Sequence, residues 1–358
     1  MKAAVCHEFE KPLVIEELEL DPPQAGEVKV KLSACAICHS DIHYMEGAWG
    51  GQLPAVYGHE AAGVVDSVGP GVRAIKPGQH VVVTLIRSCG HCFYCEQGEP
   101  TICDGEFPAD DEGRLHKAGN SILQGMQTAA FAEETVVHES QVVAIPEGVP
   151  MDSASLLACG VITGLGAVTN TAQVPSGSTV VVIGTGGVGL NSIQGARISG
   201  AHVIVAVDLV DEKLEAARLF GATHTVNARD NDVRDFIRSV TSGRGADYVF
   251  ITVGNPRAIE DSFHYIRSGG TTVIVGMPAV GDMVNFDPLK VAGSNQRVLG
   301  SKMGATRLRV DMPKLIELYQ QGRLKLDELI SNRYPLEEIN EAVASVNRQE
   351  ALRNVIVF

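Results

Sequence analysis

The stretch Val180-Val-Val-Ile-Gly184-Thr-Gly186-Gly187-Val188-Gly189-Leu190, just past the middle of the chain, decides the fold. Its four β-branched residues predict a buried strand, and the composition from Asn191 to Ile198 suits a helix. The glycines at 184, 186 and 189 fit G-x-G-x-x-G: the first permits a sharp turn, the second lets a pyrophosphate approach, and the third brings helix against strand. This order is typical of a dinucleotide site with the phosphates at a helix N-terminus, although glycine-rich turns also occur for packing reasons alone.

A second predicted strand, from Ala201 to Val207, ends in Asp208 at about the interval expected for a ribose-binding carboxylate. A carboxylate there accepts hydrogen bonds from both adenosine ribose hydroxyls and repels a 2′-phosphate. A simple turn residue is the alternative interpretation of Asp208. Together with the glycine turn, this residue predicts a site for NAD rather than NADP.

Length and charge limit the possible functions. A chain of 358 residues predicts two or three domains, and 45% hydrophobic with 20% charged residues is typical of a globular protein. The net charge of −14 argues against a nucleic-acid surface. The N-terminal segment lacks the apolar core of a signal peptide, and no apolar stretch reaches membrane-spanning length. We therefore expect a cytoplasmic protein with neither a membrane nor a nucleic acid as partner.

The predicted secondary structure changes its character twice along the chain. The first part predicts antiparallel, barrel-like β structure, with an acidic loop at 104–121. From about Ser153, strands alternate with helices, which implies a parallel sheet covered on both faces. The tail predicts two amphipathic helices, 312–321 and 336–346, and a last strand, 353–358. We expect this tail to fold back onto the first domain.

Four cysteines at 89, 92, 95 and 103 form the strongest local motif. Their spacing can wrap one tetrahedral Zn²⁺ and leave no open position, so the site is of the structural type. Free core cysteines and an iron–sulfur ligand set are the alternatives. The long last spacer and the lack of a second such cluster favour zinc, and we expect His91 inside this lobe to be a surface residue.

Two further stretches carry residues able to bind a metal, Cys38-His-Ser-Asp-Ile-His43 and Gly58-His-Glu60. Each alone has an ordinary explanation as core or surface. They occur in order with the four-cysteine lobe, Ala158-Cys-Gly160, Thr163-Gly164 and the glycine turn, and in this combination the chain resembles the zinc-containing medium-chain alcohol dehydrogenases from about Val5 to Phe358. The resemblance implies an α/β protein with a GroES-like β-rich catalytic domain at 1–160 that contains the lobe 89–103. A Rossmann doubly wound parallel sheet would follow at 161–300, and a return to the catalytic domain at 301–358.

The resemblance implies two Zn²⁺ ions per subunit. It assigns Cys38, His59 and Cys159 to a catalytic zinc with an open fourth position, and the four cysteines of the lobe to a structural zinc. Relatives that act on polyols commonly have Glu at the third ligand position, so Cys159 favours an alcohol dehydrogenase. Quinone reductases of the superfamily lack the ligand set.

The same resemblance implies a path for the alcohol proton. Ser40 would accept the proton and pass it through the nicotinamide ribose to His43 near solvent. Asp41 would orient His59, and Glu60 would lie behind the metal.

Further cofactor contacts also follow from the resemblance. Lys213 would contact the ribose and Arg353 the pyrophosphate, while the segment Val275-Gly-Met277 would pass beside the nicotinamide. His39 stands where relatives often have Arg, which would loosen NAD binding and speed NADH release.

The expected substrate is a small uncharged alcohol or aldehyde. The only tryptophan, Trp49, and the apolar residues Leu85 and Met277 match pocket-lining positions of the family. The family also pairs its coenzyme domains through the strand near Val298 to Ser301, so a homo-oligomer is expected, a dimer rather than a tetramer.

These expectations describe an NAD-dependent zinc alcohol dehydrogenase that interconverts primary alcohols and aldehydes. One alternative is a specialised dehydrogenase of a thiol-conjugated hydroxymethyl group, against which the lack of a basic anchor counts. Another is a non-catalytic dinucleotide-binding or structural protein, which would need neither an open zinc site nor a proton relay.

Overall fold

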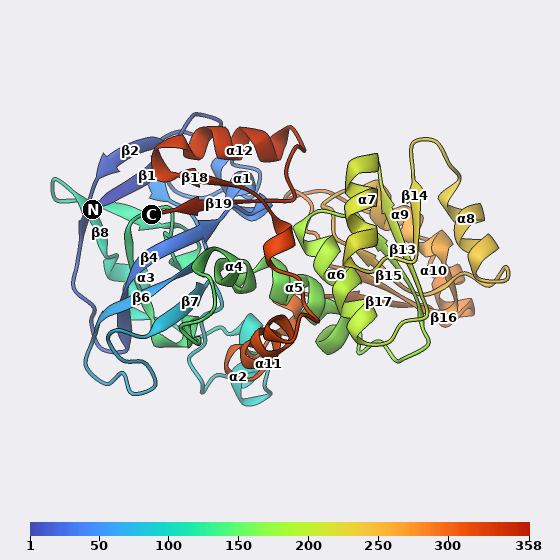
Figure 1. The fold of residues 1–358 in the computed structure, drawn as a ribbon, viewed down its shortest axis with the longest axis horizontal. Coiled ribbons are helices and arrows are strands. Elements are labelled where there is room, and N and C mark those ends of the chain that lie inside the picture. The colour runs from blue at the N-terminus through green and yellow to red at the C-terminus, as the bar shows by residue number, and fades with distance from the viewer. The chain divides into compact units, whose positions relative to one another are not determined.

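The computed structural model describes residues 1–358, and the chain divides into two compact units. Unit 1 comprises Met1–Gly160 and Arg307–Phe358, whereas unit 2 comprises Val161–Thr306. In Figure 1, unit 1 contains the blue and cyan strands together with the red C-terminal elements, and unit 2 contains the yellow and orange elements.

Two sheets form the body of unit 1. The first has the order β2-β1-β5-β9-β8-β3 and consists of β1 (Lys2–Cys6), β2 (Val14–Glu17), β3 (Glu19–Leu20), β5 (Ala55–Val56), β8 (Leu115–Lys117) and β9 (Asn120–Gln124). The second has the order β11-β7-β6-β4-β19-β18, with β10 also on β4, and consists of β4 (Glu27–Ala36), β6 (Glu60–Val68), β7 (His80–Thr84), β10 (Glu134–His138), β11 (Val142–Ala144), β18 (Ile330–Pro335) and β19 (Arg353–Val357). Most pairings are antiparallel, and β19 from the C-terminal tail pairs with β4, with Val355 opposite Ala36.

Alternation along β4 explains how the second sheet acquires a core face. Val28, Val30 and Leu32 are buried, while Lys29 and Lys31 point outward. A strand places successive side chains on opposite faces, so this pattern buries one face only. The helices of unit 1 are α1 (His39–Met45), α2 (Phe93–Glu96), α3 (Pro108–Glu112), α4 (Met151–Ser155), α11 (Leu308–Gln320) and α12 (Ile339–Asn347), with α5 (Gly160–Gly166) beginning at the boundary.

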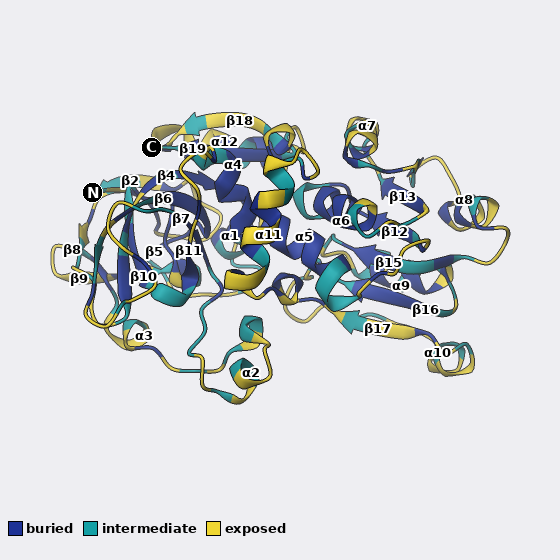
Figure 2. Ribbon diagram, turned by 60° about the horizontal axis from the view of Figure 1, so that its bottom comes forward, coloured by how far each residue is buried: buried dark blue, intermediate teal, exposed yellow.

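Unit 2 is a single parallel sheet with the order β14-β13-β12-β15-β16-β17. Its strands are β12 (Thr179–Ile183), β13 (Val203–Asp208), β14 (His224–Asn227), β15 (Ala246–Ile251), β16 (Ile266–Ile274) and β17 (Arg297–Gly300). Its helices include α6 (Gly187–Ile198), α7 (Asp211–Phe220), α8 (Val233–Val240), α9 (Pro256–Tyr265) and α10 (Pro288–Gly293). The central strands are dark blue in Figure 2, because helices cover both faces of the sheet. The predicted fold class, a GroES-like β-rich domain with a Rossmann sheet, is confirmed.

The expectation of a loop over 104–121 is wrong, because this segment contains α3, β8 and the start of β9. Pro108 begins α3, and two aspartates lie in its first turn, where the helix dipole favours negative charge. Arg87 binds both carboxylate oxygens of Asp110, at 2.7 and 2.6 Å. Arg114 forms a buried pair with Glu27 at 2.9 Å. The acidic composition therefore reflects a helix start and ion pairs rather than an irregular loop.

No single helix of the chain combines the length and apolar character needed to cross a membrane. One bent pair, Met151–Ala158 with Gly160–Thr171, passes by length and composition only.

Candidate active site and metal centres

Three segments distant in the sequence bring Cys38, His59 and Cys159 together in unit 1. Cys38 directly precedes α1, His59 directly precedes β6, and Cys159 lies between a short 3-10 turn and α5. Their ligand atoms and a carboxylate oxygen of Glu60 all lie within 4.8 Å of one another. None of the four residues is more than 9% exposed. Two thiols and an imidazole form a donor set that Zn²⁺ prefers, with one position left for another ligand.

The imidazole of His59 is held in one orientation by Asp41. The Nδ1 atom of His59 lies 2.9 Å from Oδ1 of Asp41, whose carboxylate also accepts from the backbone N–H groups of Gly58 and Cys38. The other ring nitrogen, Nε2, is buried and has no hydrogen-bond partner. An unpaired buried polar atom is costly, and ligation of a metal removes that cost. The residues present therefore fit a zinc ion.

The two thiols of this cluster differ in their affinity for a proton. The hydrogen bond with Cys159 lowers the pKa of Cys38 well below its ordinary value, while the same bond and burial raise the pKa of Cys159. The thiolate is the form that binds a metal. One thiolate is thus favoured at Cys38 before any metal binds.

Behind the cluster, Glu60 forms a buried ion pair with Arg353. The Oε1 atom of Glu60 lies 2.6 Å from Nη2 of Arg353, and both side chains are at most 6% exposed. Burial raises the pKa of Glu60 to about 7, although the charge of Arg353 opposes this change. A side chain at Gly160, next to Cys159, would collide with the guanidinium of Arg353. The assignment of Arg353 to a pyrophosphate stays a prediction, and the structure adds this contact with Glu60.

The four cysteines of the lobe lie within 4.8 Å of one another by their sulfur atoms. Backbone N–H groups point at three of the sulfurs: Cys92 N at Cys89, Cys95 N at Cys92, and both Cys89 N and Gly105 N at Cys103, at 3.3 to 3.4 Å. Backbone hydrogen bonds, that from His91 first, hold the pKa of Cys89 at about 6. The lobe fits one Zn²⁺ with four thiolates and no open position. Its short helix α2 is teal and yellow in Figure 2, in contrast to the buried cluster.

Helix α1 has a buried face and a half-buried face. Asp41 and Ile42 are buried, whereas Ser40 and His43 are half-buried. Residues three apart lie on the same face of a helix, so Ser40 and His43 are neighbours on the outer side of α1. Their predicted relay roles are compatible with this placement but remain predictions.

Trp49 follows α1 and packs on residues of that helix. Its ring lies 4.9 Å from the ring of His43 and meets the ring of Tyr44 edge-on at 5.3 Å, measured between ring centroids. Leu85, half-buried, comes directly after β7. The pocket assignments of Trp49, Leu85 and Met277 remain predictions.

In unit 2, each glycine of the turn has a distinct environment. Gly184 has φ +90° and faces the side chain of Val253, so a larger residue is excluded on both grounds. A side chain at Gly189 would collide with the carbonyl of Gly184, which is the close helix–strand approach. Nothing lies within 4 Å of a Cβ placed at Gly186. The N-terminus of α6 has no side-chain cap, so the N–H groups from Gly187 to Gly189 face this open position, as a pyrophosphate site requires.

Asp208 ends β13 beside the glycine turn. Its Oδ2 accepts from both the backbone N–H and the hydroxyl of Thr185, at 2.7 and 2.9 Å, and its Oδ1 accepts from Leu209 N and Val210 N. A carboxylate has about four acceptor sites and these four hydrogen bonds use them, so ribose hydroxyls would have to replace some of them, and the ribose role of Asp208 stays a prediction. The turn and the carboxylate therefore form one connected structure.

The remaining predicted cofactor residues are spread over both units. Lys213 lies in the first turn of α7, Val275 is buried just after β16, and Met277 is 54% exposed. His39 is exposed at the start of α1 in unit 1. No contact in the structure tests their roles.

Sequence reasoning missed three functional features. Neither Thr185, which donates to Asp208, nor Tyr44, which packs against Trp49, is among the site residues predicted from the sequence. The pairing of Glu60 with Arg353 joins residues 293 positions apart. Only for Thr185 was there a signal, since a hydroxyl beside the turn can reach a carboxylate that ends the next strand.

Comparison with known proteins gives two family matches. Residues 24–147 match the model described as alcohol dehydrogenase GroES-like domain, and residues 187–321 match zinc-binding dehydrogenase. An NDMA-dependent alcohol dehydrogenase of Amycolatopsis methanolica is 38% identical over 99% of this chain and 98% of its own. The S-(hydroxymethyl)glutathione dehydrogenase of Saccharomyces cerevisiae is also 38% identical, over 99% and 95%. The crystal structure of benzyl alcohol dehydrogenase from Acinetobacter calcoaceticus is 30% identical with a TM-score of 0.94, covering 100% of this chain and 99% of that one.

Proposed function

The chain belongs to the family of zinc-containing medium-chain alcohol dehydrogenases, and we propose that it interconverts small primary alcohols and aldehydes with NAD as the hydride carrier. It is a zinc-dependent alcohol dehydrogenase, an oxidoreductase that acts on CH–OH groups. The family assignment does not favour a non-catalytic protein or a specialised thiol-conjugate enzyme. The observation that carries the proposal is the buried cluster of Cys38, His59 and Cys159, in which Nε2 of His59 has no partner.

Each residue of the cluster has a separate task. Cys38, His59 and Cys159 would hold the metal, which when bound would supply a Lewis acid that makes the alcohol hydroxyl more acidic. Asp41 fixes the His59 ring through Nδ1, which leaves Nε2 available as a ligand. Glu60 and Arg353 compensate each other's charge beside the thiolates.

Ser40 and His43 move the proton. The Ser40 hydroxyl accepts the proton of the alcohol, and the half-buried imidazole of His43, three residues later on the same face of α1, releases it to solvent. Both directions of the reaction can use this path, because each group accepts and donates.

NAD is the cofactor that the second unit supports best. The glycine turn with the open position at Gly186 accommodates a pyrophosphate at the N-terminus of α6. Asp208 accepts from the ribose hydroxyls and repels a 2′-phosphate. Lys213, Val275, Met277, His39 and Arg353 complete the proposed contacts. The relative named as NDMA-dependent makes the identity of the electron acceptor a point for direct test.

The proposed substrate is small and uncharged. Trp49, Leu85 and Met277 are large or apolar, and they offer no charged group to anchor a substrate. A reducing compartment suits eight free cysteines, six of which belong to the two metal clusters, so we place the protein in the cytoplasm.

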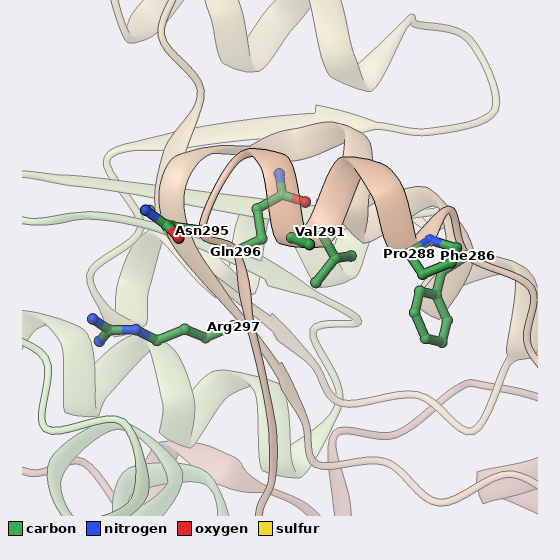
Figure 3. A pocket seen from close by; sticks show the side chains of 8 residues that line it. Phe286, Pro288, Val291, Asn295, Gln296 and Arg297 are labelled. Atoms are coloured by element: carbon green, nitrogen blue, oxygen red, sulfur yellow. The ribbon is translucent and has the colours of Figure 1, made fainter.

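We further propose a homo-oligomer, and a dimer rather than a tetramer, through the edge strand β17. This strand ends the sheet of unit 2, so one side of its backbone pairs with no strand. Large exposed apolar side chains occur in the segment before it and on the strand itself: Met277, Val280, Met283, Phe286, Leu289 and Val298. One of them, Phe286, lines a shallow hollow of about 590 Å³ together with residues that include Val291 and Arg297 (Figure 3). Such patches mark interaction surfaces.

Light scattering after gel filtration tests the oligomer. A second copy pairing β17 with β17 would bury Leu289 and Val298. Leu289→Asp should shift the mass toward that of one chain, whereas the exposed Phe93→Asp in unit 1 should not. A single-chain mass for the unaltered protein would refute the proposal.

Absorbance of NADH tests the reaction. The zinc-loaded protein, NAD and a series of linear, branched and aromatic alcohols are mixed, and the same series is run with NADP. We expect activity with NAD and small primary alcohols, and loss of it on metal chelation. Asp208→Gly should narrow the preference for NAD over NADP by at least about tenfold. Activity only with an artificial acceptor, or equal rates with NADP, would contradict the choice of cofactor.

A further inference from the structure

Trp49 and His43 are in contact, although the proposed function gives them separate roles. The ring centroids lie 4.9 Å apart, with an angle of 39° between the planes. One ring belongs to the substrate pocket in the proposal and the other to the proton path. Both rings are half-buried, and both lie in unit 1.

Local backbone geometry produces this contact. After the end of α1, Gly47 N bonds to Tyr44 O, Ala48 N bonds to His43 O, and Gly50 N bonds to Gly47 O, at 2.9 to 3.1 Å. Gly47 and Gly50 have φ of +76° and +72°, conformations that favour glycine. The turn therefore reverses the chain and returns Trp49 over the helix end from which it came.

A second aromatic contact fixes the indole from the other side. Tyr44 meets Trp49 edge-on at 5.3 Å, with planes at 88°, and stacks on Tyr57 at 5.9 Å. Tyr57 is 2% exposed, and it is two residues before the metal-binding His59. Edge-on and offset aromatic pairs are favourable arrangements. The row Tyr57, Tyr44, Trp49 and His43 thus connects the ligand segment to the exit of the proton path.

We propose that Trp49 is a positioning residue of the proton relay, which covers one face of the His43 imidazole and thereby couples the choice of alcohol to proton release. This inference rests on the proposed function, since it requires His43 to carry the proton. The nitrogens of an imidazole bind in the plane of the ring, so an indole on its face fixes the ring without blocking them. Attraction to the indole face grows when His43 is protonated, because the cation then meets the negative face of the ring. Trp49 therefore holds His43 most firmly in the state from which the proton leaves.

The contact can be tested without substrate. Trp49 is the only tryptophan of the chain, so the intrinsic emission of tryptophan reports this site alone. Because the imidazole of His43 contacts the indole, we expect His43→Gln to change the intensity of the tryptophan emission at a fixed pH. His116→Gln in β8, a histidine paired with Asp21, should leave the emission unchanged. An emission in His43→Gln equal to that of the unaltered protein would refute the contact.

Kinetics test the coupling. Trp49→Leu should lower the rate of the first turnover of a small linear alcohol by about threefold, whereas Trp49→Phe, which keeps an aromatic face, should lower it less. In the His43→Gln protein, Trp49→Leu should cause no further loss of rate. Trp49→Leu also enlarges the proposed pocket, so it should raise the rate with bulky alcohols relative to small ones. This change should appear in both backgrounds, because it depends on pocket volume alone.

The outcomes separate this inference from the proposed function. If the rate losses of Trp49→Leu and His43→Gln multiply in the double variant, the coupling is refuted. The proposed reaction would not be affected by that result. If His43→Gln leaves the rate unchanged, the relay assignment of His43 fails. If no alcohol is oxidised with NAD, the proposed function fails, and the emission experiment still decides whether the ring contact exists.

Discussion

The two cysteine clusters of unit 1 use the same kind of ligand in opposite ways. The lobe takes four sulfurs from residues 89–103, all half-exposed, and surrounds three of them with backbone N–H groups. The other cluster takes two sulfurs and one imidazole from residues 38, 59 and 159, all buried. The lobe offers four equivalent ligands to one ion. The buried cluster offers three, and its fourth neighbour, Glu60, is engaged by Arg353.

This difference shows what a closed and an open site require of a fold. The ligands of the lobe are close in sequence, so short turns suffice to place them, and the metal can organise the segment. The buried cluster takes its ligands from the residues just before α1, β6 and α5, so it forms only when the fold of unit 1 brings these three segments together. A structural site can therefore stabilise a local segment, whereas a catalytic site depends on the stability of the whole unit.

Removal of a ligand from the buried cluster should have the largest effect. Cys38→Ala leaves two ligands, so we expect the metal content to fall from two ions to one per chain and kcat/KM to fall by roughly 1000-fold or more. Metal analysis and NADH absorbance measure the two quantities. Cys35→Ala is the matched control, since Cys35 is buried nearby but lies outside the ligand set, and it should keep both ions. Activity within tenfold of the unaltered protein would refute the assignment of Cys38.

The corresponding change in the lobe should separate stability from chemistry. Cys103→Ala should also reduce the metal content to one ion, and lower Tm by roughly 5–10 °C, as a loss of about 2–3 kcal/mol would in a unit of this size. Turnover per folded molecule should stay within about twofold. His91→Ala, which alters the lobe without touching a sulfur ligand, should keep both ions. If Cys103→Ala lost activity to the same extent as Cys38→Ala, the assignment of a structural role to the lobe and a catalytic role to the buried cluster would be refuted.

A smaller effect should follow when only the orientation of His59 is disturbed. Asp41→Asn keeps the shape of the side chain but replaces the charged acceptor of the Nδ1 proton, so the metal affinity of the buried cluster should fall by about 10–100-fold. Competition with a chromophoric chelator measures this affinity. The lobe should retain its ion, and Asp66→Asn on the exposed side of β6 should change neither site. Equal losses of metal from both sites would contradict the orienting role.

The sequence predicts the glycine turn and the four-cysteine lobe well, because both depend on local spacing. The strand, glycine turn and helix at 180–198 needed only periodicity and three glycines, and the fold class built on them is confirmed. The ligand spacing of the lobe similarly identified a compact group, which the structure brings together. The three distant ligands came from the resemblance rather than from spacing, since nothing local to Cys38 indicates that Cys159 lies beside it.

Contacts between side chains account for what the sequence did not predict. Charge and glycine predict a loop over 104–121, but the structure forms α3 there, in which Asp110 pairs with Arg87 and Glu112 with Arg114. The pair of Glu60 with Arg353 and the ring contact of Trp49 with His43 depend on how elements pack. Propensity and periodicity carry no information about such contacts.

The smallest expected effect concerns His138, which helps to hold the lobe in place through Ser140. Ser88, next to the first lobe cysteine, donates its N–H to the hydroxyl of Ser140, which lies 2.8 Å from Nδ1 of His138. Burial first, and the charges of Arg87 and Arg309, lower the pKa of His138, although Glu139 and Glu27 oppose this change. Because the folded protein then binds a proton less readily than the unfolded chain, this part of the stability is present above about pH 6.5 and is lost as the pH falls.

A comparison of melting temperatures at about pH 7.5 and about pH 5.5 tests this anchor. On acidification, the Tm of the unaltered protein should fall further than the Tm of His138→Gln. The difference between these two falls should be smaller than the loss of Tm that Cys103→Ala causes. His116→Gln, on β8 and away from the lobe, should behave like the unaltered protein. The effect should also be confined to the lobe, so acidification should release segment 87–112 to limited proteolysis earlier in the unaltered protein than in His138→Gln. If the two proteins lost Tm equally and were cleaved alike, the lobe would be held by its metal alone, and its independence from the rest of unit 1 would be greater than we infer.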